Sequence, residues 1–276
     1  MAAILSSQDT PKTTRNMSIP IAASAATVAD RLTPNSRIQQ LYRLRLAESQ
    51  ADVEAAQRLR YRVFNVEMGE GLASAEETGM DVDIFDAVCD HLLVEEIASN
   101  TLVGTYRVQM GDRALAGSGF YSAREFDFTP FLGRASELVE LGRACVHKAH
   151  RNLVVLGLLW KGIANYAKNH GGRYLIGCSS LTSQDPAEGI ALYHTLKARF
   201  LAPPEWVTRP MPGFVCEAEP VTTPVRAPKL MSAYFSIGAK FCGEPAIDAE
   251  FKTIDFLTLV DIQALPASVA ARYELR

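Results

Sequence analysis

The stretch that decides the fold runs Glu137-Leu-Val-Glu-Leu-Gly-Arg-Ala-Cys-Val-His-Lys-Ala-His-Arg151. Its first part predicts a buried strand, and its last part predicts a basic loop. Amphipathic spacing from Asn152 to Asn169 predicts a helix after that loop, and Tyr174 to Ser179 predicts a second buried strand. Glu140 and Arg143 interrupt the first strand, and buried charges are costly unless they are paired or used. We therefore expect the chemistry of this protein to lie on this strand.

The composition indicates a soluble globular protein. The chain has 276 residues, of which 48% are hydrophobic and 21% are charged, and its formal net charge is −3. This charge argues against nonspecific nucleic-acid binding. The five cysteines form no Cys-x-x-Cys pair, which predicts reduced thiols, and no His, Cys or Asp cluster has the spacing of a metal site. The chain contains no apolar run of membrane-spanning length and no secretory signal, so we expect a cytoplasmic protein.

The pattern of elements predicts a mobile tail and one folded domain. Residues 1–35 are rich in Ser, Thr and Ala and predict the tail, although Ser18-Ile-Pro-Ile could instead be a short anchor. Residues 36–276 predict a single α/β domain, with a mixed, twisted central sheet flanked by helices, that includes a C-terminal extension.

Local patterns place further elements around the deciding stretch. We expect a strand at 41–46, a helix from the N-cap Asp52 to Phe64, a polar loop at 68–86 outside the core, a hairpin of 91–97 with 101–108, a helix at 188–200, a proline-rich extended connection at 203–228, a helix at 230–239 and a strand at 252–259. The aromatic segment 120–131 and Trp160 could line an apolar tunnel, but core packing is the preferred interpretation.

The two charges on the strand allow two interpretations. Glu140 can take a proton from an amine, directly or through water, and Arg143 can hold a carboxylate or phosphate. A structural ion pair with another buried charge is equally consistent with the spacing. On a regular strand the two side chains face opposite sides, unless a bulge or Gly142 changes the alternation.

The basic loop favours an anion. Lys148, His150 and Arg151 precede the N-terminus of the predicted helix, where backbone N–H groups attract negative charge. The loop lacks a glycine-rich turn that would wrap a pyrophosphate, so a single phosphate is favoured over a dinucleotide. The alternative is an ordinary solvated loop.

Taken in order, these segments resemble the GCN5-related N-acetyltransferase (GNAT) fold, and within it the L-ornithine N-alpha-acyltransferase family of ornithine-lipid synthesis. The resemblance covers roughly residues 40 to 262. It is carried by segments that include Leu59-Arg-Tyr-Arg-Val-Phe64, Cys89-Asp-His-Leu-Leu-Val94, Val103-Gly-Thr-Tyr-Arg107, Glu140-Leu-Gly-Arg-Ala-Cys-Val-His147 and Gly238-Ala-Lys-Phe-Cys-Gly243. The chain is more distantly similar to acyl-homoserine-lactone synthases and N-acyl amino acid synthases. It has Val66 in the region where the lactone synthases carry a tryptophan soon after their phenylalanine.

The resemblance implies an enzyme that moves a long-chain, 3-hydroxylated acyl group from acyl carrier protein to the alpha-amine of ornithine or a similar amino acid. No tightly bound cofactor is implied, because the acyl-phosphopantetheine of the carrier protein is a co-substrate. Transient peripheral contact with the inner face of the membrane is expected, since the product is amphiphilic.

The resemblance also implies roles for individual residues. Glu140 is the candidate base, Arg143 lies beside it, and backbone N–H groups at Cys145 and Val146 would hold the thioester oxygen. The phosphopantetheine arm would meet Cys145, Lys148, His150 and Arg151. The substrate-binding residues are expected to be Arg60, Phe64, Asp83, Asp86, Asp90 and Arg107, and their individual assignments stay open. Arg60 and Arg107, with Arg143, could hold the acceptor carboxylate or organise the acidic loop. Asp83, Asp86 and Asp90 could hold a cationic side chain.

Three other functions remain open at this point. The first is an N-acyl amino acid synthase with another acceptor, or a lactone synthase. The second is a coenzyme A-dependent acetyltransferase, and the third is a noncatalytic lipid-binding module on the same fold.

Overall fold

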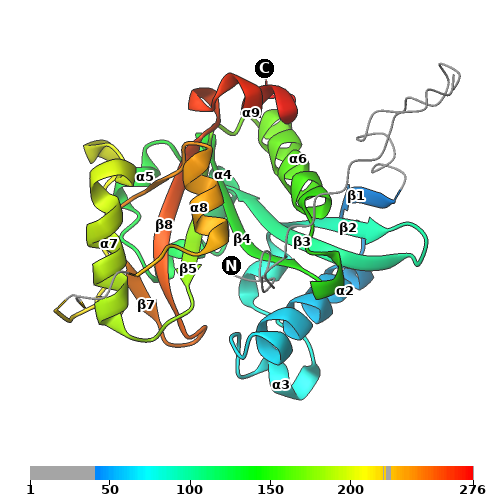
Figure 1. The fold of residues 1–276 in the computed structure, drawn as a ribbon. Coiled ribbons are helices and arrows are strands. Elements are labelled where there is room, and N and C mark those ends of the chain that lie inside the picture. Colours follow the sequence, from blue (N-terminus) through cyan, green and yellow to red (C-terminus); the bar gives the residue numbers. More distant parts are fainter. Residues whose placement is uncertain (1–40, 220, 222–224, 276) are drawn as a thin grey trace, which may run out of the picture.

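The computed structural model describes residues 41–219, 221 and 225–275, so the expected tail at 1–35 lies outside the described residues. One mixed sheet of eight strands runs through this part in the order β1-β2-β3-β4-β5-β8-β6, and β7 pairs with β8 (Figure 1). The strands are β1 (Tyr42–Leu46), β2 (Asp90–Glu96), β3 (Thr101–Met110), β4 (Leu138–Val146), β5 (Tyr174–Leu181), β6 (Lys240–Phe241), β7 (Ala246–Asp248) and β8 (Thr253–Asp261). The predicted α/β class with a mixed sheet is confirmed.

Helices cover both faces of this sheet (Figure 1). They are α2 (Gln50–Tyr61), α3 (Ala75–Thr78), α4 (Gly111–Ala116), α5 (Thr129–Leu132), α6 (Leu153–His170), α7 (Pro186–Phe200), α8 (Lys229–Ser236) and α9 (Ala267–Arg272). The main core lies under α6 and α8, where Val155, Leu159 and Tyr234 pack on β3, β4 and β8. The opposite face carries α2 and a separate cluster in which Phe128, Phe131 and Trp206 pack ring against ring.

The helix after the basic loop forms for the reasons that its sequence predicts. Asn152 is the N-cap, and its side-chain oxygen accepts hydrogen bonds from the N–H groups of Val154 (3.0 Å) and Val155 (3.1 Å). Gly171 ends the helix in the left-handed conformation, at φ 75°. The helix therefore begins and ends at the predicted residues.

Two local predictions are wrong. The N-cap of α2 is Ser49 rather than Asp52, because Asp52 occupies the third helical position and completes a capping box with Ser49. The loop at 68–86 is not too polar for the core, since Glu70, Asp81 and Asp86 are all buried. Arginine partners make this possible for the two aspartates.

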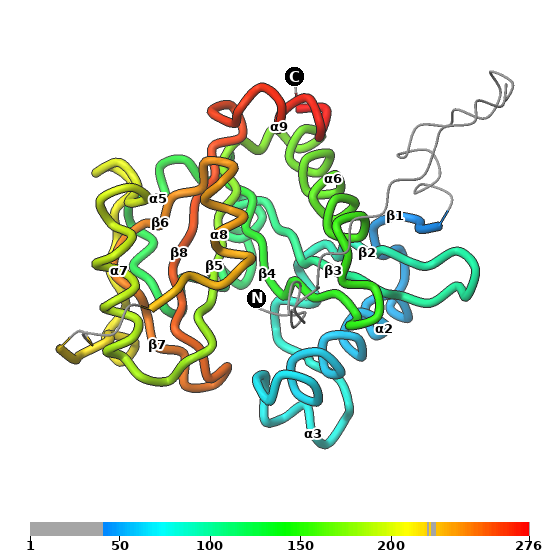
Figure 2. The backbone as a smooth tube through the Cα atoms, viewed as in Figure 1, coloured from blue at the N-terminus to red at the C-terminus, as the bar shows by residue number. Residues whose placement is uncertain are grey.

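The two strands at the centre of the sheet separate along their length (Figure 2). β4 and β5 are parallel and pair only from Leu138–Glu140 to Tyr174–Ile176. Beyond Glu140, no described strand pairs with the edge of β4 that faces β5. On its other edge β4 pairs with β3, with a register shift between Thr105 and Arg107. The sheet is thus open at its middle, next to the charged part of β4.

Candidate active site

A bulge in β4 places its two charged residues on one face. Arg143 lies in the register shift and has φ 52°, which breaks the regular alternation of side chains. Glu140 accepts a hydrogen bond from the backbone N–H of Tyr121 (2.8 Å), and Arg143 Nη1 donates to the hydroxyl of the same tyrosine (3.2 Å). The opposite orientation expected for a regular strand is therefore corrected by the bulge.

Three arginines from α2, β3 and β4 meet three aspartates of the 81–86 loop. We call this set the arginine–aspartate cluster; its members are Arg60, Arg107, Arg143, Asp81, Asp83 and Asp86. Arg60 reaches Asp86 at 2.7 Å and Asp81 at 2.8 Å. Arg107 Nη1 lies 2.5 Å from Asp83 and 3.0 Å from Asp86, and Arg143 Nη2 lies 3.0 Å from Asp83. The formal charges of the cluster balance, which is what burial requires.

The cluster keeps Asp83 and Asp86 ionised. Burial alone would raise the pKa of Asp83 and Asp86, but the facing guanidinium groups outweigh it and lower both values. Each of the three arginines forms ion pairs with two aspartates of the cluster. The cluster thus fastens the 81–86 loop onto β3 and β4.

Glu140 is held from two sides by backbone. Its two carboxylate oxygens accept hydrogen bonds from the N–H groups of Tyr121 and Ser122, each at 2.8 Å. Burial raises the pKa of Glu140, and these two hydrogen bonds oppose that rise without cancelling it. The carboxyl group thereby fixes the turn at Tyr121, which forms one wall of a pocket.

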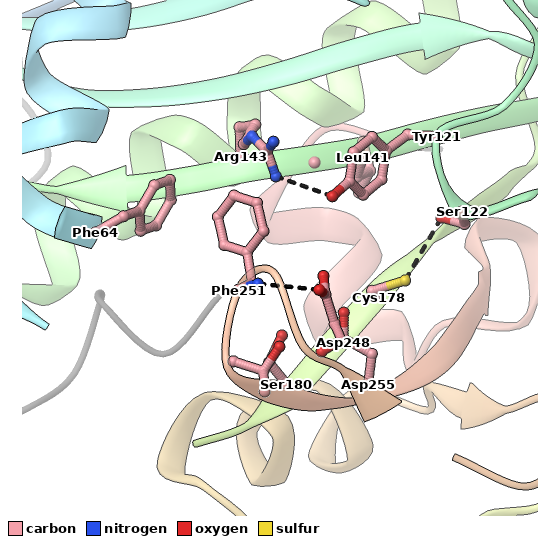
Figure 3. A pocket seen from close by; sticks show the side chains of 12 residues that line it. Phe64, Tyr121, Ser122, Leu141, Arg143, Cys178, Ser180, Asp248, Phe251 and Asp255 are labelled. Atoms are coloured by element: carbon pink, nitrogen blue, oxygen red, sulfur yellow. Dashed lines mark hydrogen bonds between the residues drawn. The ribbon is translucent and has the colours of Figure 1, made fainter. Parts of the chain in front are cut away.

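This pocket lies where β4 and β5 separate (Figure 3). Arg143 and Tyr121 stand on one side of it, and Asp248, Asp255 and Ser180 stand on the other. The guanidinium carbon of Arg143 lies 4.1 Å from the ring centre of Phe251. The remaining lining residues are Phe64, Ser122, Leu141, Gly142, Cys178 and Thr253.

Asp90 makes contacts of its own. Its carboxylate pairs with Arg113 at 2.8 Å and accepts a hydrogen bond from the hydroxyl of Tyr166, also at 2.8 Å. Among the sequence-predicted residues, Phe64 and Arg143 line the pocket, whereas Arg60, Asp83, Asp86 and Arg107 lie in the cluster behind it.

The basic loop holds its side chains in different ways. Arg151 donates to the carbonyl of Val146 (3.1 Å) and pairs with Glu67 (2.7 Å). His150 Nδ1 lies 3.0 Å from the hydroxyl of Tyr42, whereas Lys148 is exposed to solvent. Since Asn152 already occupies two N–H groups of α6, the cationic side chains are the groups best placed to meet an anion.

Cys145 is fully buried beneath α2. Burial raises the pKa of its thiol to about 12. A thiolate nucleophile is therefore strongly disfavoured at this position.

A second pocket lies across the sheet, under α6 and α8, and is mostly apolar. Its walls include Tyr106, Leu141, Trp160, Leu175 and Tyr234. Leu141 lines both pockets, so both border β4 just beyond the point where its pairing with β5 ends. The 120–131 aromatic segment packs on the opposite face, where Phe120, Phe128 and Phe131 are core residues.

Sequence reasoning missed the acidic side of the first pocket. Glu125, Cys178 and Asp255 come from three separate segments, yet one polar atom of each lies within 4.8 Å of the others. Asp248 belongs to the same wall. The sequence signal for this wall is a carboxylate inside a strand, Asp255 in β8, which is as costly to bury as Glu140 in β4.

Comparison with known proteins assigns the chain to a family. A model of the acetyltransferase (GNAT) domain matches residues 59–161. The L-ornithine N(alpha)-acyltransferase of Agrobacterium fabrum is 36% identical over 247 residues, which cover 83% of this chain and 82% of that protein. The protein of the same name from Rhodobacter capsulatus is 34% identical over 237 residues, covering 81% and 91%.

The chain belongs to the L-ornithine N(alpha)-acyltransferase family. As a member of this family it is an N-acyltransferase. The solved structure of FeeM, an N-acyl amino acid synthase from uncultured soil microbes, shares the fold at a TM-score of 0.50 and 11% identity, covering 81% of this chain and 91% of that one. Within the part of the chain that the structure describes, no helix is both long and apolar enough to span a bilayer.

Family membership explains the open sheet. An acyltransferase must bring an acyl thioester and an amine to one point, and here a polar and an apolar pocket both border β4 beside its unpaired edge. The edge offers backbone groups in a fixed arrangement, as a preorganised site requires.

Proposed function

We propose that this acyltransferase moves a long-chain 3-hydroxyacyl group from acyl carrier protein to the α-amine of L-ornithine. The observation that carries the proposal is the 36% identity, over 83% of the chain, to an enzyme named for acylating that amine. The presence of a polar and an apolar pocket that both border β4 supports it, because an amino acid and an acyl chain need such surroundings.

The acyl chain enters the apolar pocket in this proposal. Trp160 and Leu175 supply apolar walls for it. Ser179 also lines this pocket, is buried, and its hydroxyl has no hydrogen-bond partner among the described residues. A buried hydroxyl of this kind suits a hydroxyl group on the chain, which would give it the missing partner.

The phosphate of the phosphopantetheine arm lies at the basic loop in this proposal. Lys148 and His150 belong to the loop itself, and Arg151 follows it. Burial lowers the pKa of the His147 imidazole, and the nearby His150 and Arg62 lower it further, which shows that Arg62 lies close to this loop. The combined positive charge of Lys148, Arg151 and Arg62 suits a single phosphate. Cys145 and Val146 provide the adjoining strand backbone.

The chemistry requires no covalent enzyme intermediate. The deprotonated α-amine attacks the thioester carbonyl, and the backbone N–H of Val146 stabilises the oxyanion. This N–H points to the open edge of β4, because the next residue, His147, donates to Val103 on the β3 side. A new C–N bond forms, the C–S bond breaks, and the pantetheine sulfur leaves. Glu140 accepts the amine proton through a water molecule and returns it to the departing sulfur.

Lipid analysis of cells that express the chain tests the proposed function. We expect a new N-acylated ornithine whose mass and fragments show one 3-hydroxylated long chain on the α-nitrogen. Arg143→Ala should abolish it, because this side chain lines the pocket and pairs with the loop. Fractionation of the same cells should recover part of the protein with the membrane, as peripheral contact requires.

The absence of any new N-acyl amino acid, in cells that contain folded protein, would contradict the proposed function. Recovery of the protein only in the membrane-free fraction would contradict peripheral contact. Glu250→Gln is the matched control, since Glu250 is exposed and its recorded ion pair is a surface contact with Arg124.

A further inference from the structure

Two buried carboxyl groups, those of Asp248 and Asp255, line the first pocket opposite Arg143 (Figure 3). A third, that of Glu125, adjoins this lining, with an oxygen within 4.8 Å of ligand atoms of Cys178 and Asp255. We call them the acidic triad: Glu125, Asp248 and Asp255. Their exposed fractions are 2%, 5% and 5%. None of the three forms a salt bridge with any described residue, in contrast to the aspartates of the arginine–aspartate cluster. When its carboxyl groups ionise, the triad therefore has no salt-bridge partner among the described residues.

This arrangement is unfavourable in the absence of a cation. Burial raises the pKa of Glu125 and of Asp255, and repulsion between neighbouring carboxyl groups raises both further. Groups of this kind persist in folded proteins mainly where function requires them. A bound cation would relieve the repulsion and supply the counterion that the carboxyl groups lack.

Unpartnered polar atoms line the same wall. Asp255 Oδ1 and Thr253 Oγ1 have no hydrogen-bond partner among the described residues, although both residues are at least 95% buried and both line the pocket. Cys178 Sγ lies 4.0 Å from Glu125 Oε2, so the thiol adds a weak polar contact. A buried carboxylate oxygen without a donor, such as Asp255 Oδ1, indicates a place where a ligand can supply one.

The opposite side of the pocket carries positive charge. Each terminal nitrogen of Arg143 has two N–H groups, and the recorded bonds to Tyr121 and Asp83 occupy one on each nitrogen. The pocket therefore presents guanidinium donors toward β4 and carboxyl groups toward β7 and β8. An α-amino acid with a positively charged side chain has the same polarity.

We propose that the acidic triad binds the side-chain ammonium group of the acceptor, while Arg143 faces its carboxylate, so that the enzyme selects a dibasic amino acid. This inference rests on the proposed function and names the residues that give it acceptor specificity. In this orientation the α-amine, next to the carboxylate, points to the open edge of β4. The side-chain amine stays protonated within the triad and is protected from acylation.

A divalent metal ion is the competing cation, because Glu125, Cys178 and Asp255 lie close together. Coordination by Cys178 requires its thiolate. Burial, reinforced by the Glu125 and Asp255 charges, raises the pKa of this thiol well above its ordinary value. An ammonium group needs only acceptor oxygens, which the two carboxylates supply, and is therefore the favoured ligand.

The test compares two acceptors that differ only in the presence of the side-chain amine. L-Norvaline has the carbon chain of L-ornithine without the side-chain amine. The kcat/KM for ornithine divided by the kcat/KM for norvaline, measured with one acyl donor, therefore reports recognition of the ammonium group. Asp255→Asn and Glu125→Gln should each reduce this ratio at least about tenfold, while Glu250→Gln leaves it unchanged. A ratio unchanged in both pocket variants would overturn the inference.

Two further measurements separate the possible failures. Calorimetric titration with L-ornithine alone reads the pocket without any donor: wild type should bind it, and Asp255→Asn should bind it at least about tenfold more weakly. Equal binding overturns the triad assignment, even if the donor proves to be coenzyme A. Dialysis against a chelator should leave the ornithine preference intact, and its loss would assign the triad to a metal ion instead.

Folding of these variants is not expected to obscure the result. Replacing one buried carboxyl group by an amide of similar shape removes repulsion within the triad. Thermal unfolding should therefore occur at or above the wild-type temperature.

Discussion

At the scale of single residues, the two charges in β4 have different surroundings. Arg143 belongs to a cluster of balanced charges, which keeps its guanidinium group ionised and fixed. Glu140 has hydrogen-bond donors from backbone but no recorded salt bridge among the described residues, and burial raises its pKa. A carboxyl group whose pKa is raised is a better proton acceptor near neutral pH than one in water.

Replacing Glu140 by glutamine tests its role in proton transfer. The carboxylate is the active form, so wild-type kcat should fall as the pH drops through the raised pKa of Glu140, above the ordinary value near 4.3. Glu140→Gln should lower kcat about 10²- to 10⁴-fold and remove this acidic limb of the pH–rate profile. Glu137→Gln, at the residue just before the same strand, is the control and should retain the limb.

The same variant has a structural effect that must be measured separately. Glutamine places an NH₂ group opposite one of two N–H donors, at Tyr121 or Ser122, and should lower the free energy of unfolding by about 1–3 kcal/mol. Denaturant unfolding gives this value. If the acidic limb persists in a folded Glu140→Gln protein, Glu140 only positions the turn and another group accepts the proton.

Sequence alone identified Glu140 and Arg143 as unusual but could not relate them. Their spacing predicts opposite faces, and only the bulge at Arg143 brings them together. The acidic triad was invisible for a similar reason, because Glu125 and Asp255 are distant in sequence and meet only through packing. Sequence patterns give local period and composition, whereas these contacts depend on tertiary geometry.

At the scale of elements, the decisive feature is the separation of β4 from β5. Pairing ends at Glu140 and Ile176, and Gly177 is the next residue on β5. A Cβ atom at Gly177 would overlap the backbone carbonyl oxygen of Leu141. The absence of a side chain therefore lets the two strands approach closely just before the opening between them.

Gly177→Ala tests whether this close approach sets the geometry of the site. Because backbone cannot yield as a flexible side chain does, we expect a loss of about 1–3 kcal/mol in the free energy of unfolding and a clear drop in kcat/KM in protein that remains folded. Gly157→Ala in α6 is the matched control, since a Cβ there meets nothing within 4 Å. It should stabilise the helix by about 0.5–1 kcal/mol.

Wild-type stability and activity in Gly177→Ala would show that β4 and β5 tolerate displacement. The shape of their opening would then have no part in the reaction. Denaturant unfolding and steady-state kinetics of both variants, measured in one buffer, distinguish the two outcomes.

The elements themselves were largely predictable. The strand, loop, helix and strand of the opening stretch form at the expected residues, because apolar runs, an N-cap asparagine and a glycine pair are strong local signals. The polar 68–86 loop was placed outside the core because its carboxylates suggested solvent. Their arginine partners lie on α2, β3 and β4, so no local pattern could predict their burial.

At the scale of the whole molecule, the sheet separates an apolar pocket from a charged one. The face under α6 and α8 holds the apolar pocket, and the opposite face holds the charged one. Leu141 borders both, which places the meeting point of the reacting groups, in our proposal, at the opening between β4 and β5. This division lets one domain bind an acyl chain and a charged amino acid at the same time.

One measurement tests this account most directly. Purified protein is given long-chain 3-hydroxyacyl carrier protein and L-ornithine that carries heavy nitrogen only at the α position, with acetyl-coenzyme A as the alternative donor, and the products are read by mass spectrometry. We predict an amide in which the acyl group is bonded to the heavy nitrogen, formed from the carrier protein. Turnover with acetyl-coenzyme A but none with the carrier protein, or acylation of the unlabelled side-chain nitrogen, would contradict the account.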